Sequence, residues 1–354
     1  MKYINGQRVG LTLGKFLPFH RGHELLIRTA HDICPLLVVL VGVSPDDKYS
    51  FEQRKAWILS CINPSADNQV LVIKQAELDK NAPKDKDGTI TDESYWERWT
   101  SDTRSILDRI DVTSRLGFVF TSDKYGERIA TELGVMWVPI DPGREFIPTS
   151  GTAVRSDLYK EWKNLPKPTR RDLVKTVAVL GPESVGKSTA ISRMRDKYTI
   201  IPEYGRILSE AKKNELKARE FMLIQIIQQS FIKQAKFEAE YPVIVSDTEA
   251  LITALYSDLY LDKEELEQHR KRFFDAAENQ MRSGLIDRYI LLSPVVPWVQ
   301  DGYRMQDTTI KRWTFFYDIR DHLMKCGVDY KIVADTDFDI RQTKIERYIS
   351  ELLV

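Results

Sequence analysis

Apolar residues along this chain gather in short unbroken runs, and the stretches between the runs carry apolar residues at every third or fourth position. The run Pro35–Val43 contains no charged residue, which is typical of a strand buried on both faces of a parallel sheet. The segment Glu215–Glu240 instead has the spacing of an amphipathic helix. Its apolar positions are Phe221, Ile224, Ile227, Phe231 and Ala235.

Ten runs of the first kind are candidate strands, five in each half of the chain. They cover residues 9–13, 35–43, 70–73, 117–120, 136–140, 176–180, 198–201, 243–246, 289–292 and 330–333. Because helical patterns separate successive runs, we expect α/β domains with parallel sheets. Ligands of such domains bind at the carboxyl ends of the strands.

Both halves open with a strand, a glycine turn and a helix, and the turns lie at Gly14 and Gly181. Between the two patterns, Asn164–Arg171 holds two prolines and three basic residues, a composition typical of a linker. The length of 354 residues also suits two domains. We therefore expect a first domain over 1–164, a linker over 165–173 and a second domain over 174–354.

The charge balance narrows the list of expected partners. With 52 Lys and Arg residues against 52 Asp and Glu residues, the net charge gives no reason to expect nucleic acid or membrane as a partner.

No apolar run reaches the roughly 20 residues of a membrane helix, and the N-terminus lacks the apolar core of a signal peptide. Three widely spaced cysteines argue against a disulfide framework and a zinc site, so a cytoplasmic protein is expected. They are Cys34, Cys61 and Cys326.

The segment Gly181–Thr189 satisfies the P-loop pattern, which predicts binding of ATP and Mg²⁺. Glycines such as Gly181 and Gly186 let backbone N–H groups surround a phosphate. Lys187 supplies a charge to the β- and γ-phosphates, and the Ser188 hydroxyl binds Mg²⁺. Thr189 completes the motif at the start of the helix.

Two carboxylates follow later strands of the same half. Asp247 ends the run at 243–246, where a P-loop protein places a carboxylate that orients Mg²⁺ or acts as a base. Glu203 follows the run at 198–201 and precedes Arg206. The sequence does not decide whether Asp247 or Glu203 is the base. Arg304, on a glycine-containing segment, is a candidate to close over the phosphates.

In the first half, His20 and His23 stand at the start of a predicted helix, where both can face one phosphate chain. A zinc site is the competing interpretation, but no third ligand follows at a suitable spacing. Thr149–Asp157 predicts a second helix start, rich in hydroxyl groups and followed by Arg155. Taken alone it is a simple helix cap, whereas with the histidines it predicts a second anion site.

These segments carry a family resemblance. Gly14–His23 resembles the nucleotidyltransferase signature G-[KR]-F-x-P-x-H-x-G-H, and Ser150–Arg155 resembles its companion S-[SG]-T-x-x-R. A transferase half followed by a P-loop half resembles the bifunctional nicotinamide-mononucleotide adenylyltransferase and ribosylnicotinamide kinase (NadR-like) family over nearly the whole chain. The resemblance implies a Rossmann-like nucleotidyltransferase domain followed by a P-loop kinase domain. Some members begin with a helix-turn-helix, for which this chain leaves no room, so we expect no repressor function.

The resemblance also implies roles for individual residues. His20, His23 and Lys15 would contact the ATP phosphates within the motif that includes Gly14 and Phe16. Ser150, Thr152 and Arg155 would hold the triphosphate. Trp96 or Trp99 would stack on the nicotinamide ring, although two tryptophans so close together are equally typical of a core. Arg206 would contact the kinase substrate.

The implied function is a pair of ATP-dependent reactions of NAD biosynthesis. The first half would make NAD and pyrophosphate from nicotinamide mononucleotide, and the second would phosphorylate nicotinamide riboside to that mononucleotide. One alternative is the same fusion acting on pantetheine phosphate or riboflavin phosphate. Another is a nucleotide-sensing regulator with one inactive half. A homo-oligomer is compatible with the sequence, which does not distinguish nicotinamide from nicotinate substrates.

Overall fold

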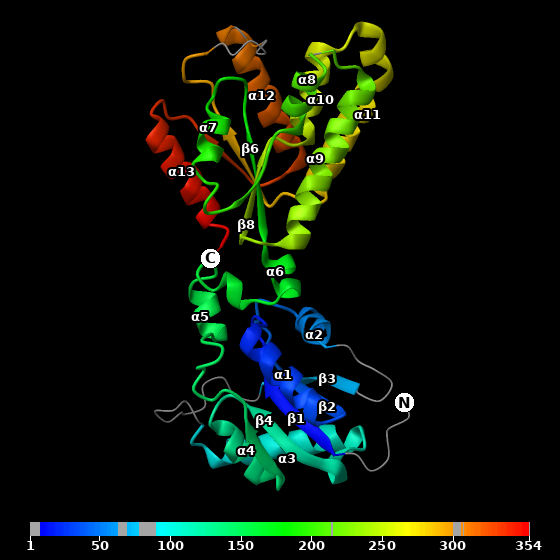
Figure 1. Cartoon of the computed structure of the whole chain (residues 1–354), viewed down its shortest axis with the longest axis vertical. Coiled ribbons are helices and arrows are strands. Elements are labelled where there is room, and N and C mark those ends of the chain that lie inside the picture. Colours follow the sequence, from blue (N-terminus) through cyan, green and yellow to red (C-terminus); the bar gives the residue numbers. More distant parts are fainter. Residues whose placement is uncertain are drawn as a thin grey trace. The chain divides into compact units, whose positions relative to one another are not determined.

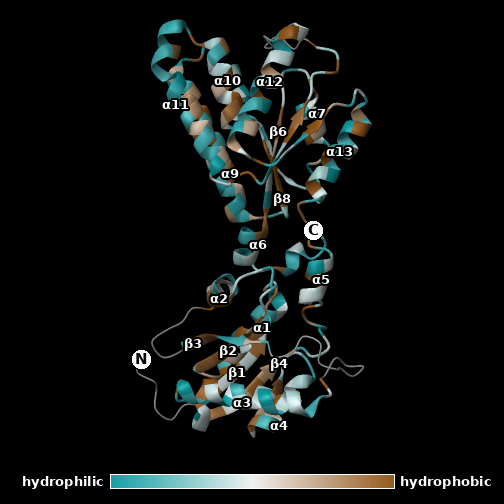
Figure 2. Cartoon of the chain, turned by 180° about the vertical axis from the view of Figure 1, so that it is seen from behind, coloured by the Kyte–Doolittle hydropathy of each residue, from teal (hydrophilic) through white to brown (hydrophobic). Residues whose placement is uncertain are grey.

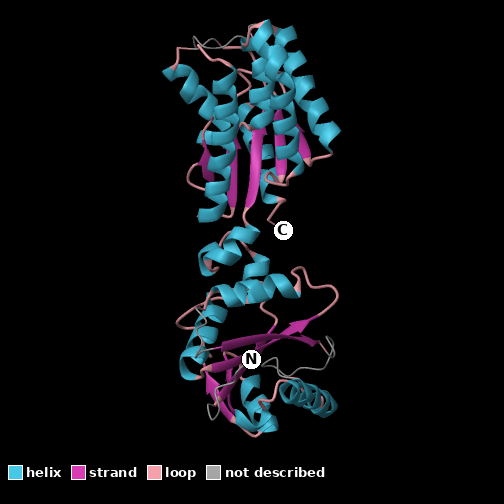
Figure 3. Cartoon of the chain, turned by 90° about the vertical axis from the view of Figure 1, so that its right-hand side faces the viewer, coloured by secondary structure: helices cyan, strands magenta, loops and turns pink. Residues whose placement is uncertain are grey.

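The structure is a computed structural model that describes residues 8–62, 69–77, 90–213, 215–299, 306 and 308–353. The chain divides into two compact units, Met1–Thr169 and Arg170–Val354. Each unit contains a five-stranded sheet in which all strands run parallel (Figure 1, Figure 3). The expected fold class is therefore confirmed.

The sheet of the first unit has the order β3-β2-β1-β4-β5. Its central strand, β1, pairs with β2 and β4, so that Thr12 lies beside Val39 and Phe120. Apolar residues of these strands pack against α3 and α4 to form the core. The strands are β1 (Val9–Gly14), β2 (Leu36–Val43), β3 (Gln69–Ala76), β4 (Leu116–Thr121) and β5 (Met136–Pro139). The helices are α1 (Arg21–Ile33), α2 (Phe51–Ser60), α3 (Glu93–Arg109), α4 (Tyr125–Leu133) and α5 (Gly151–Ser156), with 3-10 turns at Thr113–Arg115 and Trp162–Asn164.

The sheet of the second unit has the order β10-β9-β6-β8-β7. Helices α7 and α13 lie on one side of it, and α9, α10 and α11 lie on the other (Figure 1). The strands are β6 (Lys175–Leu180), β7 (Thr199–Ile201), β8 (Val243–Asp247), β9 (Arg288–Leu292) and β10 (Tyr330–Val333). The helices are α6 (Lys167–Leu173), α7 (Lys187–Ser192), α8 (Tyr204–Ala211), α9 (Ala218–Glu238), α10 (Ala250–Tyr260), α11 (Lys263–Arg282), α12 (Thr309–Cys326) and α13 (Phe338–Ser350).

The hydrophobic pattern located every strand in the described part of the chain, because these strands carry short apolar runs, and the central ones are buried on both faces (Figure 2). The long amphipathic helix is also present as α9, and the expected positions Phe221, Ile224 and Ala235 are buried on it. Gln225 and Gln228 are buried on it, whereas Phe231 is 39% exposed. Buried glutamines occur where the packed surface offers hydrogen-bond partners, which a hydrophobic pattern does not reveal.

The segment 165–173, expected to be a linker, is mostly helical because α6 occupies Lys167–Leu173. Pro168 falls in the first turn of this helix, where a missing backbone N–H has no intrahelical acceptor to lose. The division between the two units falls inside α6, after Thr169. Within the described ranges, none of the helices has the length and apolarity needed to cross a bilayer.

Candidate active sites

The first unit has a cavity of roughly 1140 Å³, open solvent at its mouth included, at the carboxyl ends of β1 and β4. Two segments about 130 residues apart in sequence meet there. One contains Gly14, Lys15, His20 and His23, and the other contains Ser150, Thr152 and Arg155. Arg155 Nη1 donates to the Leu17 carbonyl, which ties the two segments together. The two predicted anion-binding segments therefore line one cavity.

His20 and His23 form a reciprocal cap at the start of α1. The backbone N–H of His23 donates to His20 Nδ1 (3.4 Å), and the backbone N–H of His20 donates to His23 Nδ1 (3.3 Å). The rings stack with centroids 3.6 Å apart. Burial, aided by the nearby Arg144 charge, lowers the pKa of His20 to about 3, and burial also lowers the pKa of His23. Both rings are therefore neutral, with Nδ1 as acceptor and the proton on Nε2.

The second segment forms the short helix α5. Ser150 caps it by accepting from the Ala153 N–H (3.1 Å), and Arg155 Nη2 donates to Thr152 Oγ1 (3.2 Å). A Cβ at Gly151 would lie 3.1 Å from the Leu17 carbonyl oxygen, so glycine here allows the two segments to approach closely. Thr152 and Arg155 thereby reach the cavity next to the first segment.

The other residues of the first motif have different surroundings. Lys15 lines the cavity and forms an ion pair with Glu77 (Nζ–Oε1 2.7 Å). Phe16 is 1% exposed and packs edge-on against the His23 ring, with centroids 4.8 Å apart. Phe16 therefore supports the His23 ring and exposes almost none of its own surface to solvent. A Cβ at Gly14 would contact the Phe16 ring at 3.4 Å.

Trp96 and Trp99 lie in the hydrophobic core of the first unit, 5% and 6% exposed. Trp96 Nε1 donates to the Ile90 carbonyl (2.8 Å), which satisfies its polar atom. Neither ring lines the cavity. The expected stacking on a substrate ring is therefore not supported, and the packing alternative describes both residues.

Sequence reasoning missed three charged residues of this cavity, Asp123, Asp141 and Arg144. Asp123 follows β4 and pairs with Arg144 (Oδ1–Nη2 3.0 Å). Asp141 accepts the N–H groups of Phe146 and Ile147, which shapes the loop after β5. The available signal was position, because polar residues directly after parallel strands face the ligand edge of a sheet.

In the second unit, the P-loop turns between β6 and α7. A Cβ at Gly181 would lie 2.7 Å from the Leu292 carbonyl oxygen, and Gly186 has a φ of +86°, so both positions require glycine. Lys187 Nζ donates to the carbonyls of Gly181 (2.8 Å) and Pro182 (2.9 Å). Burial lowers the pKa of this lysine. The ammonium group thus folds back onto its own loop.

Two buried arginines hold the outward carbonyls of the P-loop. Arg312 of α12 donates to the carbonyls of Glu183 (3.2 Å) and Ser184 (3.3 Å). Arg341 of α13 donates to the Val185 carbonyl (3.0 Å). Three consecutive carbonyls of the loop are thus held by two side chains, and the Glu183 N–H donates to Gln306 Oε1 (3.1 Å).

Glu203 and Asp247 stand at the ends of β7 and β8. Asp247 Oδ2 accepts from the Ser188 hydroxyl (3.2 Å), and Asp247 Oδ1 is buried without a protein partner. Burial and the nearby Asp247 charge raise the pKa of Glu203 to about 7. Burial also raises the pKa of Asp247. An orphaned carboxylate oxygen beside a P-loop hydroxyl suits a Mg²⁺ ion, so the predicted ligands Ser188 and Asp247 fit that metal.

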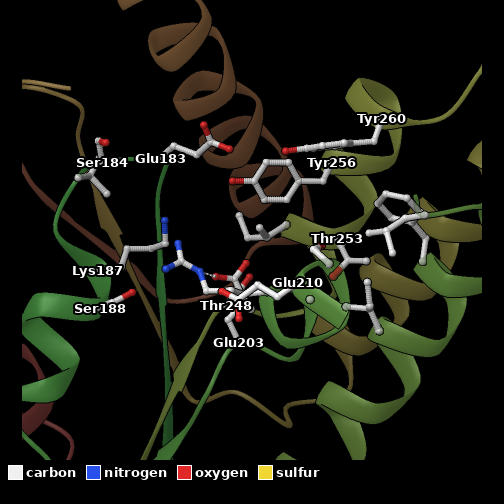
Figure 4. Close-up of a pocket in the computed structure, with 18 of the residues that line it drawn as sticks. Glu183, Ser184, Lys187, Ser188, Glu203, Glu210, Thr248, Thr253, Tyr256 and Tyr260 are labelled. Atoms are coloured by element: carbon white, nitrogen blue, oxygen red, sulfur yellow. Dashed lines mark ion pairs between the residues drawn. The ribbon is translucent and has the colours of Figure 1, made fainter. Parts of the chain in front are cut away.

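The second unit has a cavity of roughly 1080 Å³, a volume that includes open solvent at its mouth. Lys187 and Ser188 lie on one side of it and Tyr256 and Tyr260 on the other, with Glu203 between them (Figure 4). Thr189 and Arg206 also line it, and Arg206 Nε lies 4.0 Å from Glu203 Oε2. The tyrosines were missed because they lie within α10, where no motif or strand end marks them. The predicted Arg304 lies outside the described residues.

The chain is similar to known proteins in sequence and fold. The model of the AAA domain family matches residues 176–341. The trifunctional NAD biosynthesis/regulator proteins NadR of Salmonella typhimurium and Escherichia coli are 24% and 25% identical to the chain over 98% of its length, covering 84% and 83% of theirs. A crystal structure of a NadR protein with NAD and AMP-PNP is similar in fold (TM-score 0.60, 21% identity, 98% of this chain and 96% of that one). A NadR structure with NR gives 0.61 and 20%, with 99% and 98% coverage.

Proposed function

Because the chain is a distant homologue of the NadR proteins along nearly its whole length, we propose that it is a bifunctional enzyme of NAD biosynthesis. The first unit transfers the adenylyl group of ATP to nicotinamide mononucleotide, and the second phosphorylates nicotinamide riboside. The observation that carries the proposal is that each unit has its own cavity lined by a phosphate-binding motif. The product of the second unit is the substrate of the first.

In the first unit, the 5′-phosphate of the mononucleotide attacks the α-phosphorus of ATP. The new P–O bond forms NAD, and pyrophosphate leaves with the electrons of the broken bond. Since the nucleophile is already an anion, no general base is required. The residues act by positioning and charge stabilisation: Lys15 and Arg155 as cations, His20 and His23 as Nε2–H donors.

In the second unit, the 5′-hydroxyl of the riboside attacks the γ-phosphorus of ATP, ADP leaves, and a carboxylate accepts the hydroxyl proton. We assign this base to Glu203. Asp247 is engaged with Ser188 at the metal position, whereas Glu203 lines the cavity with a pKa raised to about 7, close to working pH. Bound Mg²⁺ would neutralise charge on the β- and γ-phosphates.

The tyrosines favour a riboside that carries a pyridinium ring. Tyr256 and Tyr260 pack edge-to-face, with centroids 5.8 Å apart, on the cavity wall opposite the P-loop. The face of an aromatic ring attracts a cation through its quadrupole. Glu183 of the P-loop also lines this cavity and adds a negative charge to it (Figure 4).

The test is a direct assay of the whole chain with ATP and Mg²⁺. Nicotinamide riboside should yield the mononucleotide and ADP, and nicotinamide mononucleotide should yield NAD and pyrophosphate. Riboflavin, riboflavin phosphate, pantothenate and pantetheine phosphate serve as competing acceptors. The proposal is wrong if one of these reacts while the nicotinamide compounds do not, or if the protein binds nucleotides without turnover.

A further inference from the structure

Gln228 of α9 is buried next to the segments that carry Glu203 and Asp247, and no motif contains it. It is 1% exposed. Its Nε2 donates to the Pro202 carbonyl (3.2 Å), and its Oε1 accepts from the Tyr204 N–H (3.0 Å). These two peptide groups flank Glu203. One side chain therefore holds the backbone on both sides of the proposed base.

The same amide also reaches the neighbouring strand. Gln228 Nε2 donates to Ser246 Oγ (3.1 Å), and Ser246 Oγ in turn donates to the Thr248 carbonyl (2.8 Å). Ser246 and Thr248 flank Asp247. Thr248 has a φ of +82°, a left-handed conformation that a β-branched residue adopts only when its surroundings enforce it. The hydrogen bonds of Gln228 and Ser246 belong to these surroundings.

We infer that Gln228 is a positioning residue that sets the placement of Glu203 relative to Asp247. The inference rests on the proposed function of the second unit. β7 and β8 are adjacent strands, but β7 has only three residues, so its ladder alone gives little control over the segment that carries Glu203. The hydrogen bonds of Gln228 and Ser246 supply the missing constraint at the point where the two strands end. We call this set of hydrogen bonds the bracket.

The chain offers a matched control on the same helix. Gln225 is 6% exposed and donates from Nε2 to the carbonyls of Ala250 (3.0 Å) and Phe273 (3.1 Å). Neither partner lines the cavity. Gln228→Met and Gln225→Met therefore remove buried amide hydrogen bonds of similar kind. Only those of Gln228 reach the segments that carry Glu203 and Asp247.

Kinase kcat and KM are compared for the two variants in the full chain, with thermal midpoints measured in parallel. We expect Gln228→Met to lower kcat by about 100-fold while KM for ATP changes by less than about threefold, because misplacement of a reacting group by about 1 Å has effects of this size. Gln225→Met should keep kcat near that of the unmodified chain although its midpoint falls. Equal kcat losses in the two variants, or an unchanged kcat in Gln228→Met, would overturn the inference.

Ser246→Ala tests the bracket if Gln228→Met does not fold. It should lower kcat, and where Gln228→Met also folds, the double variant should lose little more than the worse single one, because both changes break one chain of hydrogen bonds. Ser257→Ala is its control, since that buried hydroxyl donates to Ala254 within α10. Full additivity of the two losses would contradict the inference.

An unmodified chain that does not phosphorylate the riboside would refute the proposed function and not the bracket. In that case a crystal structure of Gln228→Met, or of Ser246→Ala, decides. A displaced Glu203 with the P-loop in place supports the inference, and an unmoved Glu203 overturns it.

Discussion

Glu203 lies near the carboxylate of Asp247 and the cationic groups of Lys187 and Arg206. Its protonation state controls the proposed phosphoryl transfer. Since its pKa is raised to about 7, the carboxylate form is present above that pH and is lost as pH falls through it. We expect kcat/KM for the riboside to decline by tenfold per pH unit below about 7. The measurement is a pH–rate profile between pH 5 and 9.

The matching substitution is Glu203→Gln. It should lower kinase kcat by about 10²- to 10⁴-fold and remove the acid limb of the profile, because the amide accepts no proton. Adenylyl transfer by the same preparation serves as the control for folding and concentration. A profile that is flat from pH 5 to 9 in the unmodified chain would assign the base elsewhere.

Single residues were predictable where a local motif carries them. Lys187 and Ser188 follow a glycine turn, and Asp247 ends an apolar strand, so the chain order alone brings them to one sheet edge. Gln228 and Arg144 have no such signal. Which glutamine of α9 faces β8, and where the loop after β5 turns, depend on packing between segments that are far apart in the sequence.

The arginines that bind the P-loop carbonyls lead to a prediction for helix α13. Arg341 is 2% exposed, and its loss would leave the carbonyls of Val185, Ser293 and Asp335 without their donor. Arg341→Leu should lower the unfolding free energy by about 2–5 kcal/mol, because unsatisfied buried acceptors are costly. It should also raise KM for ATP. Urea unfolding and kinase kinetics measure the two effects.

Arg347 on the same helix is the control, because its side chain is 59% exposed. Arg347→Leu should change the unfolding free energy by less than about 0.5 kcal/mol. Equal losses of unfolding free energy in the two variants would show that the P-loop contacts of Arg341 are not the cause of its effect.

Whole elements were predictable to the extent that burial follows hydrophobicity. All ten strands of the described residues were located because each carries a short apolar run, and the central ones, such as β2, β6 and β8, are buried along most of their length. The helical content of 165–173 was missed because Pro168 and the basic residues resemble a linker. They are compatible with α6, where the proline occupies the first turn. The buried face of α9 was predicted in part, because Gln225 and Gln228 lie on it together with the expected Phe221, Ile224 and Ala235.

At the scale of the molecule, each unit has its own sheet, core and cavity, so the two activities should be separable by substitution. Lys187→Met should abolish phosphorylation of the riboside and leave adenylyl transfer intact. His23→Ala should lower adenylyl transfer by at least about 100-fold and leave the kinase intact, because it removes a preorganised donor. Both reactions are followed in each variant. Loss of both in either variant would show that the units depend on one another.

The cap at the start of α1 has a consequence for how the first cavity handles charge. An imidazolium ring donates from both nitrogens and accepts from neither. If His20 or His23 gained a proton, its Nδ1 could no longer accept the backbone N–H that begins the helix. Proton uptake by either ring would therefore remove a capping hydrogen bond, at a cost of about 1 kcal/mol of helix stability. In the proposed transfer the histidines would act as uncharged donors, and the phosphate charge would be compensated by Lys15, Arg144 and Arg155.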